Sequence, residues 1–423
     1  MELAPPRGTQ DLLPPMAEAM LGLYDEAHRA AQLFGFRYLE TPMFEHTELF
    51  SRAAGDTSDV VTKEMYTFED KGGRSLTLRP ETTASVVRAY LTNAHDLPLP
   101  FKAYYLGSQF RHGRPQAGRL RELRQFGVET IGVEGPDADV EVIALVDRFL
   151  KDRGLGRITL LVNSIGDGVC RPAYRELLIA HLEPHRDELC EDCQKRLRSN
   201  PLRILDCKGD GKKAFVLDAP VISEHLCHPC RAHFDAVRMG LDAAGIGFTH
   251  DPRLVRGLDY YERTAFEFVS DALPDAAATI CGGGRYDGLA EVLGGPATAG
   301  VGFAMGLDRV LLAMDGEGVI LPAPRGLRCF VVAVGEGTRA VAAKLVHDLR
   351  DAGLPAAGAL EERPMKAQMK MADRALASFV AIIGERELAE DMVTLKRLVD
   401  GVQKTVPAGD AVGWLTRLDD WTR

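Results

Sequence analysis

Two polar stretches of this chain carry residue types that suit the chemistry of a small charged ligand. Residues 256–264 read Arg-Gly-Leu-Asp-Tyr-Tyr-Glu-Arg-Thr, and residues 281–288 read Cys-Gly-Gly-Gly-Arg-Tyr-Asp-Gly. The first holds a guanidinium, a carboxylate and two phenols, and we interpret the second as a glycine-rich turn that lets backbone approach a ligand closely. If the first stretch is extended, Tyr260 and Tyr261 point to opposite faces. The alternative is a buried tyrosine beside a surface arginine.

An arginine-rich segment at residues 111–124 is the second feature with clear chemistry. It holds five arginines, and strand-like segments 103–110 and 124–132 flank it. Two strands around one long loop, with no helix between them, favour antiparallel pairing. The arginine side chains would then converge at the entrance of one binding site. Guanidinium groups match phosphate oxygens in geometry and charge. An ordinary solvated loop is the alternative.

Three further residues offer polar groups for an amino-acid ligand. Glu81 precedes a predicted helix, and Gln125 and Glu129 share one face of a strand because side chains alternate along it. A pair of carboxylates is a good receptor for an ammonium group, although either carboxylate alone also suits an ordinary surface position. Farther along, Gly302–Arg309 reads as a strand end followed by a helix start, which favours anions.

The cysteines are unevenly distributed along the chain. Five of the eight lie in Cys190-x-x-Cys193, Cys207 and Cys227-x-x-Cys230. In a reducing compartment this spacing favours a metal over a disulfide. Cys190, Cys193, Cys227 and Cys230 would together form a four-thiolate zinc site, and reduced structural thiols are the alternative.

The elements that must position these residues follow from apolar periodicity and turn signals. Apolar residues at helical spacing predict a first helix ending near Phe34, and residues from about 170 to 250 read as a helical insertion. After an Ala-Pro-Arg-Gly linker at 323–326, strands and helices alternate. We therefore predict an α+β fold with one domain at 1–325 and a small α/β domain at 326–423. The other predicted elements are helices at 82–93, 137–153 and 338–352 and after 306, and strands at 36–42, 65–68, 75–78, 157–163, 264–269, 299–303, 329–334 and 379–384.

Composition and charge narrow the class of protein. The 423 residues are 46% hydrophobic and 26% charged, as in an ordinary globular protein. A net charge of −10 argues against indiscriminate nucleic-acid binding, which needs local lysine and arginine, but allows a specific RNA partner. The N-terminus lacks the pattern of a signal peptide and no apolar run approaches a membrane span, so we expect a cytoplasmic protein with no membrane partner.

Taken jointly, these segments resemble the class II aminoacyl-tRNA synthetases, and specifically the histidyl-tRNA synthetase family. The segment around Pro42 is similar to motif 1, Phe110–Glu129 to motif 2 and Gly302–Arg309 to motif 3. Residues 256–264 and 281–288 resemble the two histidine-specific motifs. The resemblance implies an antiparallel catalytic sheet flanked by helices, with the helical insertion and a C-terminal anticodon-binding domain.

The resemblance also implies roles for single residues. Arg111 and Arg256 would be catalytic, because they would stabilise charge on the α-phosphate of ATP. Glu81 would face the histidine amino group, and Glu129 with Tyr261 would hold the imidazole. Magnesium would arrive with ATP as a substrate. The implied histidine-binding set is Glu81, Thr82, Thr83, Arg111, Gln125, Glu129, Arg256, Tyr260 and Tyr261, and the implied ATP-binding set is Arg111, Arg119 and Arg309.

The chain departs from the family pattern at two positions of motif 2. Gly113 stands where a glutamate is usual, and Leu123 stands where an aromatic side chain normally stacks on adenine. These departures predict adenylation with weakened ATP binding.

The implied function is a homodimeric histidine–tRNA ligase that acts on L-histidine, ATP and tRNA(His). In the C-terminal domain, Lys366, Lys370 and Arg374 recur at helical spacing. We predict that this face meets tRNA phosphates, with a solvated helix face as the alternative. The resemblance does not itself imply a zinc site, and structural zinc at the cysteines stays possible. Two other functions stay open, namely a non-catalytic paralogue that serves as a regulatory subunit and a sensor of uncharged tRNA.

Overall fold

The chain forms two compact units, Met1–Ala323 and Pro324–Arg423. The computed structural model describes residues 3–55, 60–274, 277–321 and 326–417. Most of the segment predicted as a linker, at 323–326, lies outside the described residues. Among the described helices, none is both long and apolar enough to cross a membrane.

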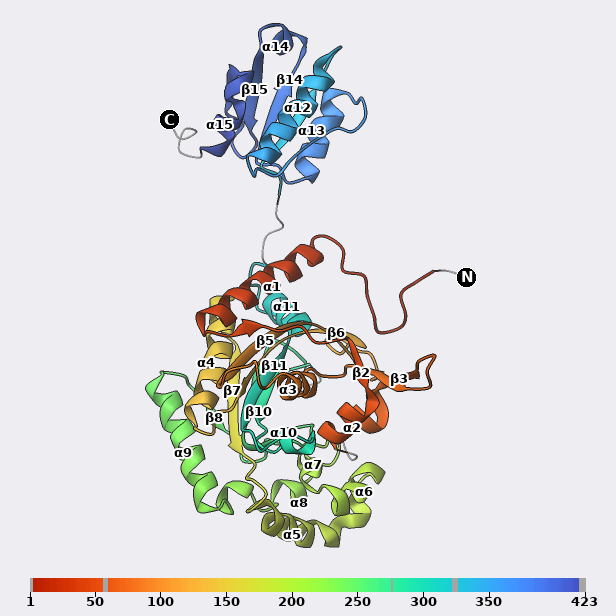
Figure 1. The fold of residues 1–423 in the computed structure, drawn as a ribbon, viewed down its shortest axis with the longest axis vertical. Helices are drawn as coiled ribbons and strands as arrows, with labels where there is room; N and C mark the ends of the chain where they lie inside the picture. The colour runs from red at the N-terminus through yellow and green to blue at the C-terminus, as the bar shows by residue number, and fades with distance from the viewer. Residues whose placement is uncertain (1–2, 56–59, 275–276, 322–325, 418–423) are drawn as a thin grey trace. The chain divides into compact units, whose positions relative to one another are not determined.

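An eight-stranded sheet forms the centre of the N-terminal unit (Figure 1). Its strands, in order across the sheet, are β1 (Arg37–Tyr38), β5 (Phe101–Phe110), β6 (Glu122–Ile131), β11 (Gly300–Gly306), β10 (Thr279–Arg285), β9 (Glu262–Ser270), β7 (Ile158–Ser164) and β8 (Thr249–His250). The two edge strands β1 and β8 pair in parallel with their neighbours, and all other pairs are antiparallel. The antiparallel pairing of β5 with β6 around the arginine-rich loop is therefore confirmed.

The glycine-rich stretch is part of a central strand, so its interpretation as a turn was wrong. Residues Thr279–Arg285 form β10, between β9 and β11. An ideal Cβ atom on Gly282 would overlap the guanidinium of Arg256, and one on Gly283 would overlap the carbonyl oxygen of Gly302. Glycine is a poor strand former, but here neighbouring groups pass too close to the backbone for any side chain.

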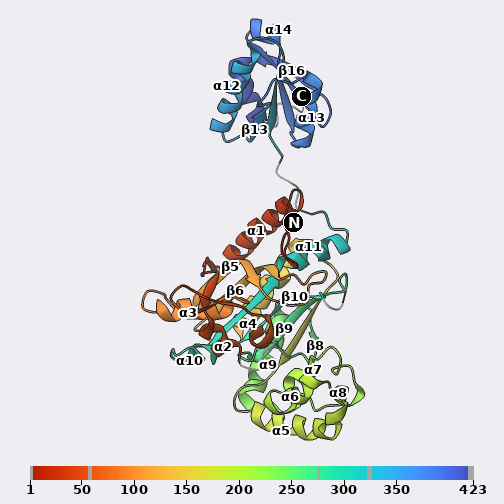
Figure 2. The same ribbon diagram turned by 90° about the vertical axis from the view of Figure 1, so that its right-hand side faces the viewer.

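Helices cover both faces of this sheet (Figure 1 and Figure 2). One face packs against α1 (Met16–Leu33), α4 (Asp137–Asp152), α9 (His228–Ala243) and α11 (Leu307–Gly316) in the largest apolar core. The other face packs against α2 (Thr47–Ala54), α3 (Thr83–Thr92) and α10 (Leu289–Val292). A small antiparallel sheet adjoins α2 and consists of β2 (Phe44–His46), β4 (Ser75–Leu78) and β3 (Tyr66–Glu69). The strands predicted at 65–68 and 75–78 correspond to β3 and β4, which pair with each other.

Short helices fill most of the segment between β7 and α9, where a helical insertion was predicted. They are α5 (Arg171–Leu182), α6 (Glu191–Ser199), α7 (Leu202–Leu205) and α8 (Ala214–Leu217). Figure 2 shows them gathered at the end of the N-terminal unit, below the sheet. They enclose a small apolar core of their own, to which Tyr174, Leu178 and Leu197 contribute.

The C-terminal unit is a small α/β domain around a five-stranded sheet. Its strands, in order, are β13 (Ala356–Gly358), β12 (Cys329–Ala333), β14 (Phe379–Ile383), β15 (Met392–Arg397) and β16 (Gln403–Pro407). Strand β12 pairs in parallel with β13 and β14, whereas β15 pairs antiparallel with β14 and β16. The predicted partly parallel sheet is confirmed. Its helices are α12 (Thr338–Asp351), α13 (Met365–Arg374), α14 (Glu385–Ala389) and α15 (Ala411–Thr416).

Candidate active site

One cavity of about 910 Å³ brings together most of the residues predicted to bind substrates. Those that line it are Glu81, Thr83, Arg111, Arg119, Gln125, Arg256, Tyr260, Tyr261 and Arg309. They come from strands of the central sheet, from the start of α3 and α11, and from the loops at 111–121 and 251–261. Thr82 and Glu129 are buried and are not among the lining residues.

The side chains of Arg111, Arg119 and Arg309 line the cavity together. Arg309 Nε donates to the Gly118 carbonyl oxygen at 2.7 Å, which ties the helix start of α11 to the arginine-rich loop. Burial lowers the pKa of Arg309, and the nearby cations of Arg111 and Arg119 lower it further. Positive charges held this close together favour the binding of a polyanion. This wall is therefore suited to phosphate groups.

A carboxylate from a distant part of the chain stands beside the position of Gly113. Glu64 forms an ion pair with Arg119, and the His112 N–H donates to the Glu64 carbonyl oxygen at 2.7 Å. An ideal Cβ atom on Gly113 would lie 3.2 Å from Glu64 Oε1. A larger residue at 113 would thus crowd this ion pair. Sequence reasoning missed Glu64, since nothing local links it to the arginine-rich loop.

Contacts with neighbouring side chains hold the Arg256 guanidinium in place inside the cavity. Its guanidinium pairs with Glu267, whose other oxygen accepts a hydrogen bond from Thr279 Oγ1 at 2.9 Å. The guanidinium also lies over the Tyr261 ring, 5.3 Å from its centroid. Gly282 is paired with Glu267 across β9 and β10 and leaves the space that Arg256 occupies. Sequence reasoning missed Glu267, although strand alternation in β9 places it on the face opposite Phe266 and Phe268.

The two tyrosines of the 256–264 stretch lie side by side, because the segment lacks the extended conformation that would have placed them on opposite faces. Their ring centroids are 4.6 Å apart, and both rings are buried. The segment turns at Tyr260 instead of running extended, and this brings both phenols to one pocket. Tyr260 Oη donates to Glu81 Oε2 at 3.5 Å, and Glu81 Oε1 accepts the Ala84 N–H at 3.1 Å.

Glu129 lies next to this pocket, fully shielded from solvent. Burial raises the pKa of Glu129 to about 8, even though hydroxyl donors favour its charged form. Thr83 Oγ1 donates to one carboxylate oxygen at 2.6 Å, and the Tyr286 hydroxyl donates to the other. Burial also raises the pKa of Glu81. The pocket thus holds two carboxyl groups whose charge is costly until a cation or a donor arrives.

The insertion supplies part of the cavity wall, which sequence reasoning did not predict. Arg203 Nη1 donates to the Gly257 carbonyl oxygen at 2.7 Å, and Asn200 Nδ2 donates to Asp259 Oδ1 at 2.8 Å. Both acceptors belong to the stretch that carries Arg256 and the tyrosines. The insertion therefore braces the backbone of this stretch from outside the sheet.

The four cysteines of the zinc hypothesis do not meet at a single site. The two CxxC pairs begin at different helices, α6 and α9. Each pair lies instead with another cysteine and an aspartate. One group consists of Asp167, Cys170, Cys227 and Cys230, and the other consists of Cys190, Cys193, Cys207 and Asp210. The single four-thiolate arrangement is therefore wrong.

In the C-terminal unit, the three basic residues predicted to bind tRNA share one helix. Lys366, Lys370 and Arg374 are all exposed on α13, whereas Gln368 and Ala372 face the sheet and are buried. Gln368 fixes the helix, because its Nε2 donates to the Ala333 carbonyl oxygen at 2.7 Å. The basic face is thus open to a partner.

Comparison with known proteins finds relatives along most of the chain. A histidyl-tRNA synthetase family model matches residues 8–310, and an anticodon-binding domain model matches residues 328–418. The histidine–tRNA ligase of Geobacillus kaustophilus is 50% identical over 413 residues, which cover 97% of both chains. The crystal structure of apo S. aureus histidyl-tRNA synthetase superposes with a TM-score of 0.84 at 39% identity, covering 98% of this chain and 100% of that one.

A more distant structure shares the fold alone. It is described as an ATP phosphoribosyltransferase regulatory subunit/histidyl-tRNA synthetase from Bacillus halodurans, and it matches with a TM-score of 0.64 at 21% identity over 91% of this chain and 99% of that one. The full-length matches at much higher identity decide the assignment. This chain belongs to the histidyl-tRNA synthetase family.

Proposed function

We propose that this chain is a histidine–tRNA ligase, which activates L-histidine with ATP and transfers it to tRNA(His). One observation carries the proposal: Arg111, Arg256 and Arg309, from three distant segments, line one cavity together with Glu81. A carboxylate can attack a polyphosphate only where the repulsion between the two anions is offset, and guanidinium groups provide this.

In the first step, the histidine carboxylate attacks the α-phosphorus of ATP. A bond forms between a carboxylate oxygen and phosphorus, the bond to the bridging oxygen breaks, and pyrophosphate leaves. Arg256 and Arg111 are the catalytic groups, because they offset charge on the carboxylate and on the α-phosphate. Arg256 Nε is buried and has no hydrogen-bond partner among the described residues, as expected of a group that awaits its ligand.

The pocket beside Arg256 fits the histidine side chain and amino group. Glu81, placed next to the hydroxyl of Tyr260, receives the ammonium group. Glu129 and Tyr261 hold the imidazole, and Thr83 orients Glu129 through its hydroxyl. The remaining proposed histidine contacts are Thr82 and Gln125. Among the described residues, neither the Thr82 hydroxyl nor Gln125 Oε1 has a hydrogen-bond partner.

The arginine-rich wall fits the triphosphate. Arg119 and Arg309 hold the outer phosphates, with Glu64 releasing Arg119 as the nucleotide enters. Enzymes of this family use ATP with magnesium, and the metal ion travels with the nucleotide as part of the substrate. In the second step, a hydroxyl of the terminal ribose of the tRNA attacks the carbonyl carbon of the adenylate and AMP leaves, so no protein nucleophile is needed.

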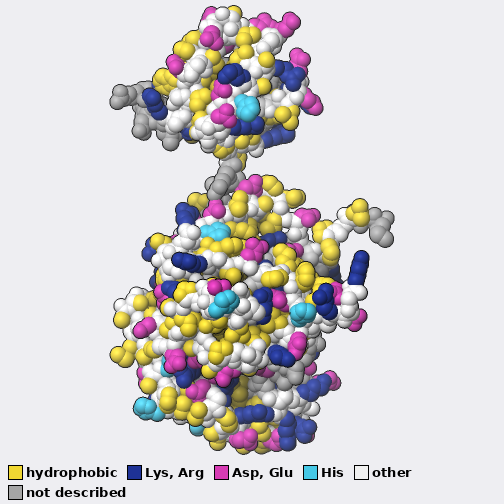
Figure 3. Space-filling model, in the orientation of Figure 1, with side chains coloured by type: hydrophobic (Ala, Val, Ile, Leu, Met, Phe, Trp, Pro, Cys, Tyr) yellow, Lys and Arg dark blue, Asp and Glu magenta, His cyan; other side chains and the backbone are white. Residues whose placement is uncertain are grey.

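Two partner surfaces complete the proposal. The basic face of α13, with Lys366, Lys370 and Arg374, meets phosphates of tRNA(His), since these three side chains are exposed and Lys and Arg bind phosphate. A homodimer forms through the segment that resembles motif 1, and exposed apolar side chains there support this, Met43 being 54% and Phe44 51% exposed. Figure 3 shows hydrophobic side chains spread over the middle of one face of the N-terminal unit.

Exchange of labelled pyrophosphate into ATP tests the first step. The chain should catalyse exchange that depends on histidine, and Arg256→Ala should lower it by about 100-fold or more. Arg148→Ala is the matched control, because Arg148 is a surface arginine on α4 whose side chain is 60% exposed. A non-catalytic paralogue would give no such exchange, so a rate that is equal with and without histidine would overturn the proposal.

A further inference from the structure

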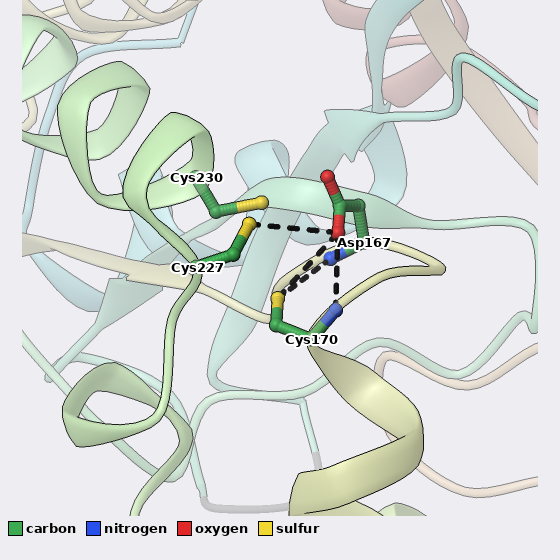
Figure 4. Close-up of side chains that lie close together, drawn as sticks. All are labelled: Asp167, Cys170, Cys227 and Cys230. Atoms are coloured by element: carbon green, nitrogen blue, oxygen red, sulfur yellow. Dashed lines mark hydrogen bonds between the residues drawn. The ribbon is translucent and has the colours of Figure 1, made fainter.

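Two clusters of sulfur and carboxylate ligands lie in the insertion and at its start. The Asp167 cluster comprises Asp167, Cys170, Cys227 and Cys230 (Figure 4), and the Asp210 cluster comprises Cys190, Cys193, Cys207 and Asp210. In each cluster, one potential ligand atom from every residue lies within 4.8 Å of the others. Each cluster therefore offers four donors around one point.

The two clusters repeat one sequence pattern in mirror order. Asp167-x-x-Cys170 joins Cys227-x-x-Cys230, whereas Cys190-x-x-Cys193 joins Cys207-x-x-Asp210. Each cluster thus combines two pairs of ligands spaced by two residues, which is the spacing of structural zinc sites. In each, an aspartate takes the place of one of the four cysteines. A search for cysteines alone misses both aspartates and pairs the wrong segments.

The distances suit a central ion and exclude disulfides. Cys190 Sγ and Cys207 Sγ are 4.0 Å apart, and Asp167 Oδ1 lies 3.5 Å from Cys170 Sγ and 3.9 Å from Cys227 Sγ. A tetrahedral zinc ion with bonds of about 2.3 Å to sulfur separates its ligands by about 3.8 Å. A disulfide needs about 2.0 Å, and all eight cysteines are free. Figure 4 shows the Asp167 carboxylate directed toward the sulfur atoms.

Groups outside the Asp210 cluster hold its ligands in place. Asp210 Oδ1 is paired with Lys213 Nζ at 2.8 Å, and Asp210 Oδ2 accepts the Cys190 N–H at 2.9 Å. Cys207 Sγ accepts the Asp210 N–H at 3.5 Å. Such contacts orient metal ligands, and the lysine offsets part of the excess negative charge of three thiolates and one carboxylate.

The Asp167 cluster has the same kind of support. Arg263 Nη2 lies 3.7 Å from Asp167 Oδ2, and the Asp167 N–H donates to Cys170 Sγ at 3.3 Å. Cys170 and Cys230 are buried. Reduced thiols alone would pack well in an apolar core, but this packing does not explain why Asp167 Oδ1 faces the sulfur atoms of Cys170 and Cys227.

The positions of the clusters indicate what an ion would do. The Asp167 cluster ties the chain that follows β7 to the start of α9, on either side of the short helices α5–α8. The Asp210 cluster ties the start of α6 to the loop after α7, and its Cys207 lines the substrate cavity. Small units with small cores commonly need such a cross-link. The insertion's core is small, and Cys170, Cys193 and Cys230 already form part of it.

We propose that each cluster binds one structural zinc ion, so that the insertion is held closed at its base and at the substrate cavity. Thiolates with one carboxylate in tetrahedral arrangement select zinc over magnesium or calcium, which prefer oxygen ligands. The two sites are independent, because no ligand is shared between them.

Elemental analysis of the full chain, produced with zinc in the medium and purified without chelator, tests the proposal. We expect about two zinc ions per chain. The double variant Cys170→Ser with Cys230→Ser should lose one ion, and Cys190→Ser with Cys207→Ser should lose the other. Cys329→Ser is the matched control, since Cys329 is buried in the C-terminal unit, and it should keep both.

Two further measurements keep the test decisive if a serine variant does not fold. Cobalt added to the zinc-stripped native chain should give thiolate-to-cobalt charge-transfer absorption, and Asp167→Cys should keep its metal while strengthening that absorption. Iodoacetamide should label the exposed Cys190 only after zinc is stripped. A native chain with neither zinc nor cobalt absorption overturns the proposal, and zinc that persists in a folded serine variant overturns the assignment of that cluster.

Discussion

The buried carboxyl group of Glu129 makes the stability of the N-terminal unit depend on pH. Burial raises the pKa of Glu129 from 4.5 to about 8. The unfolded chain releases this proton near pH 4.5, whereas the folded protein keeps it until about pH 8. Folding therefore takes up a proton between these values. The stabilisation is fully present below the unfolded pKa and is lost as pH rises through the folded pKa.

The size of this effect follows from the two pKa values. Each pH unit in that window removes about 1.4 kcal/mol from the free energy of unfolding. Between pH 5.5 and 7.5 the loss is therefore about 3 kcal/mol, in the limit that no other group compensates. Because the side chain has 0% exposure, solvent screening does not reduce the effect.

The variant Glu129→Gln isolates this contribution, because glutamine keeps the shape of glutamate but does not titrate. Urea unfolding followed by far-ultraviolet circular dichroism should show that the native chain loses stability relative to the variant as pH rises from 5.5 to 7.5. Both tryptophans follow residue 400, so tryptophan fluorescence tracks the C-terminal unit and serves as an internal control. Equal pH slopes for the native chain and the variant would refute the reasoning.

Two further substitutions test the placement of the arginine and the basic helix face. Gly282→Ala should displace Arg256, whose guanidinium an ideal Cβ atom would overlap, and histidine-dependent pyrophosphate exchange should fall about 100-fold. Gly247→Ala, with nothing within 4 Å of its added Cβ atom, should leave exchange unchanged, and an equal loss in both variants would contradict this explanation. Lys366→Glu combined with Lys370→Glu should weaken tRNA binding about tenfold in a filter-binding assay without changing exchange; unchanged tRNA affinity would remove this face from the interface.

Features with a local signal were predictable from the sequence. Apolar periodicity located α1 and α4, and strand patterns on either side of the arginine-rich loop gave β5 and β6 with their antiparallel pairing. Candidate residues such as Arg111 and Arg309 were found because arginine in a loop or at a helix start suits an anion. Whether these side chains line the same cavity depends on the order of the strands in the sheet. The resemblance to a known family indicated that order, whereas the patterns around single residues did not.

Features that depend on tertiary contacts could not be predicted from local sequence patterns. The partners of the arginines, Glu64 and Glu267, come from segments with no visible link to them. The turn at Tyr260 reverses what an extended segment predicts, and the glycines of β10 look like a turn until the crowding around them is known. The cysteine pairs were visible, but which segments face each other could be learned only from the packing of the insertion.

The bare backbone at the centre of β10 also restricts how this chain can vary. Every replacement of Gly282, Gly283 or Gly284 adds a Cβ atom, and each would overlap a guanidinium, a carbonyl oxygen or another backbone group. At Gly283 and Gly284 the added atom would meet neighbouring backbone, which cannot move aside easily, whereas a glycine with open surroundings, such as Gly247, has room for a side chain. Resistance mutations against an inhibitor seated on this strand would therefore have to arise elsewhere in the pocket.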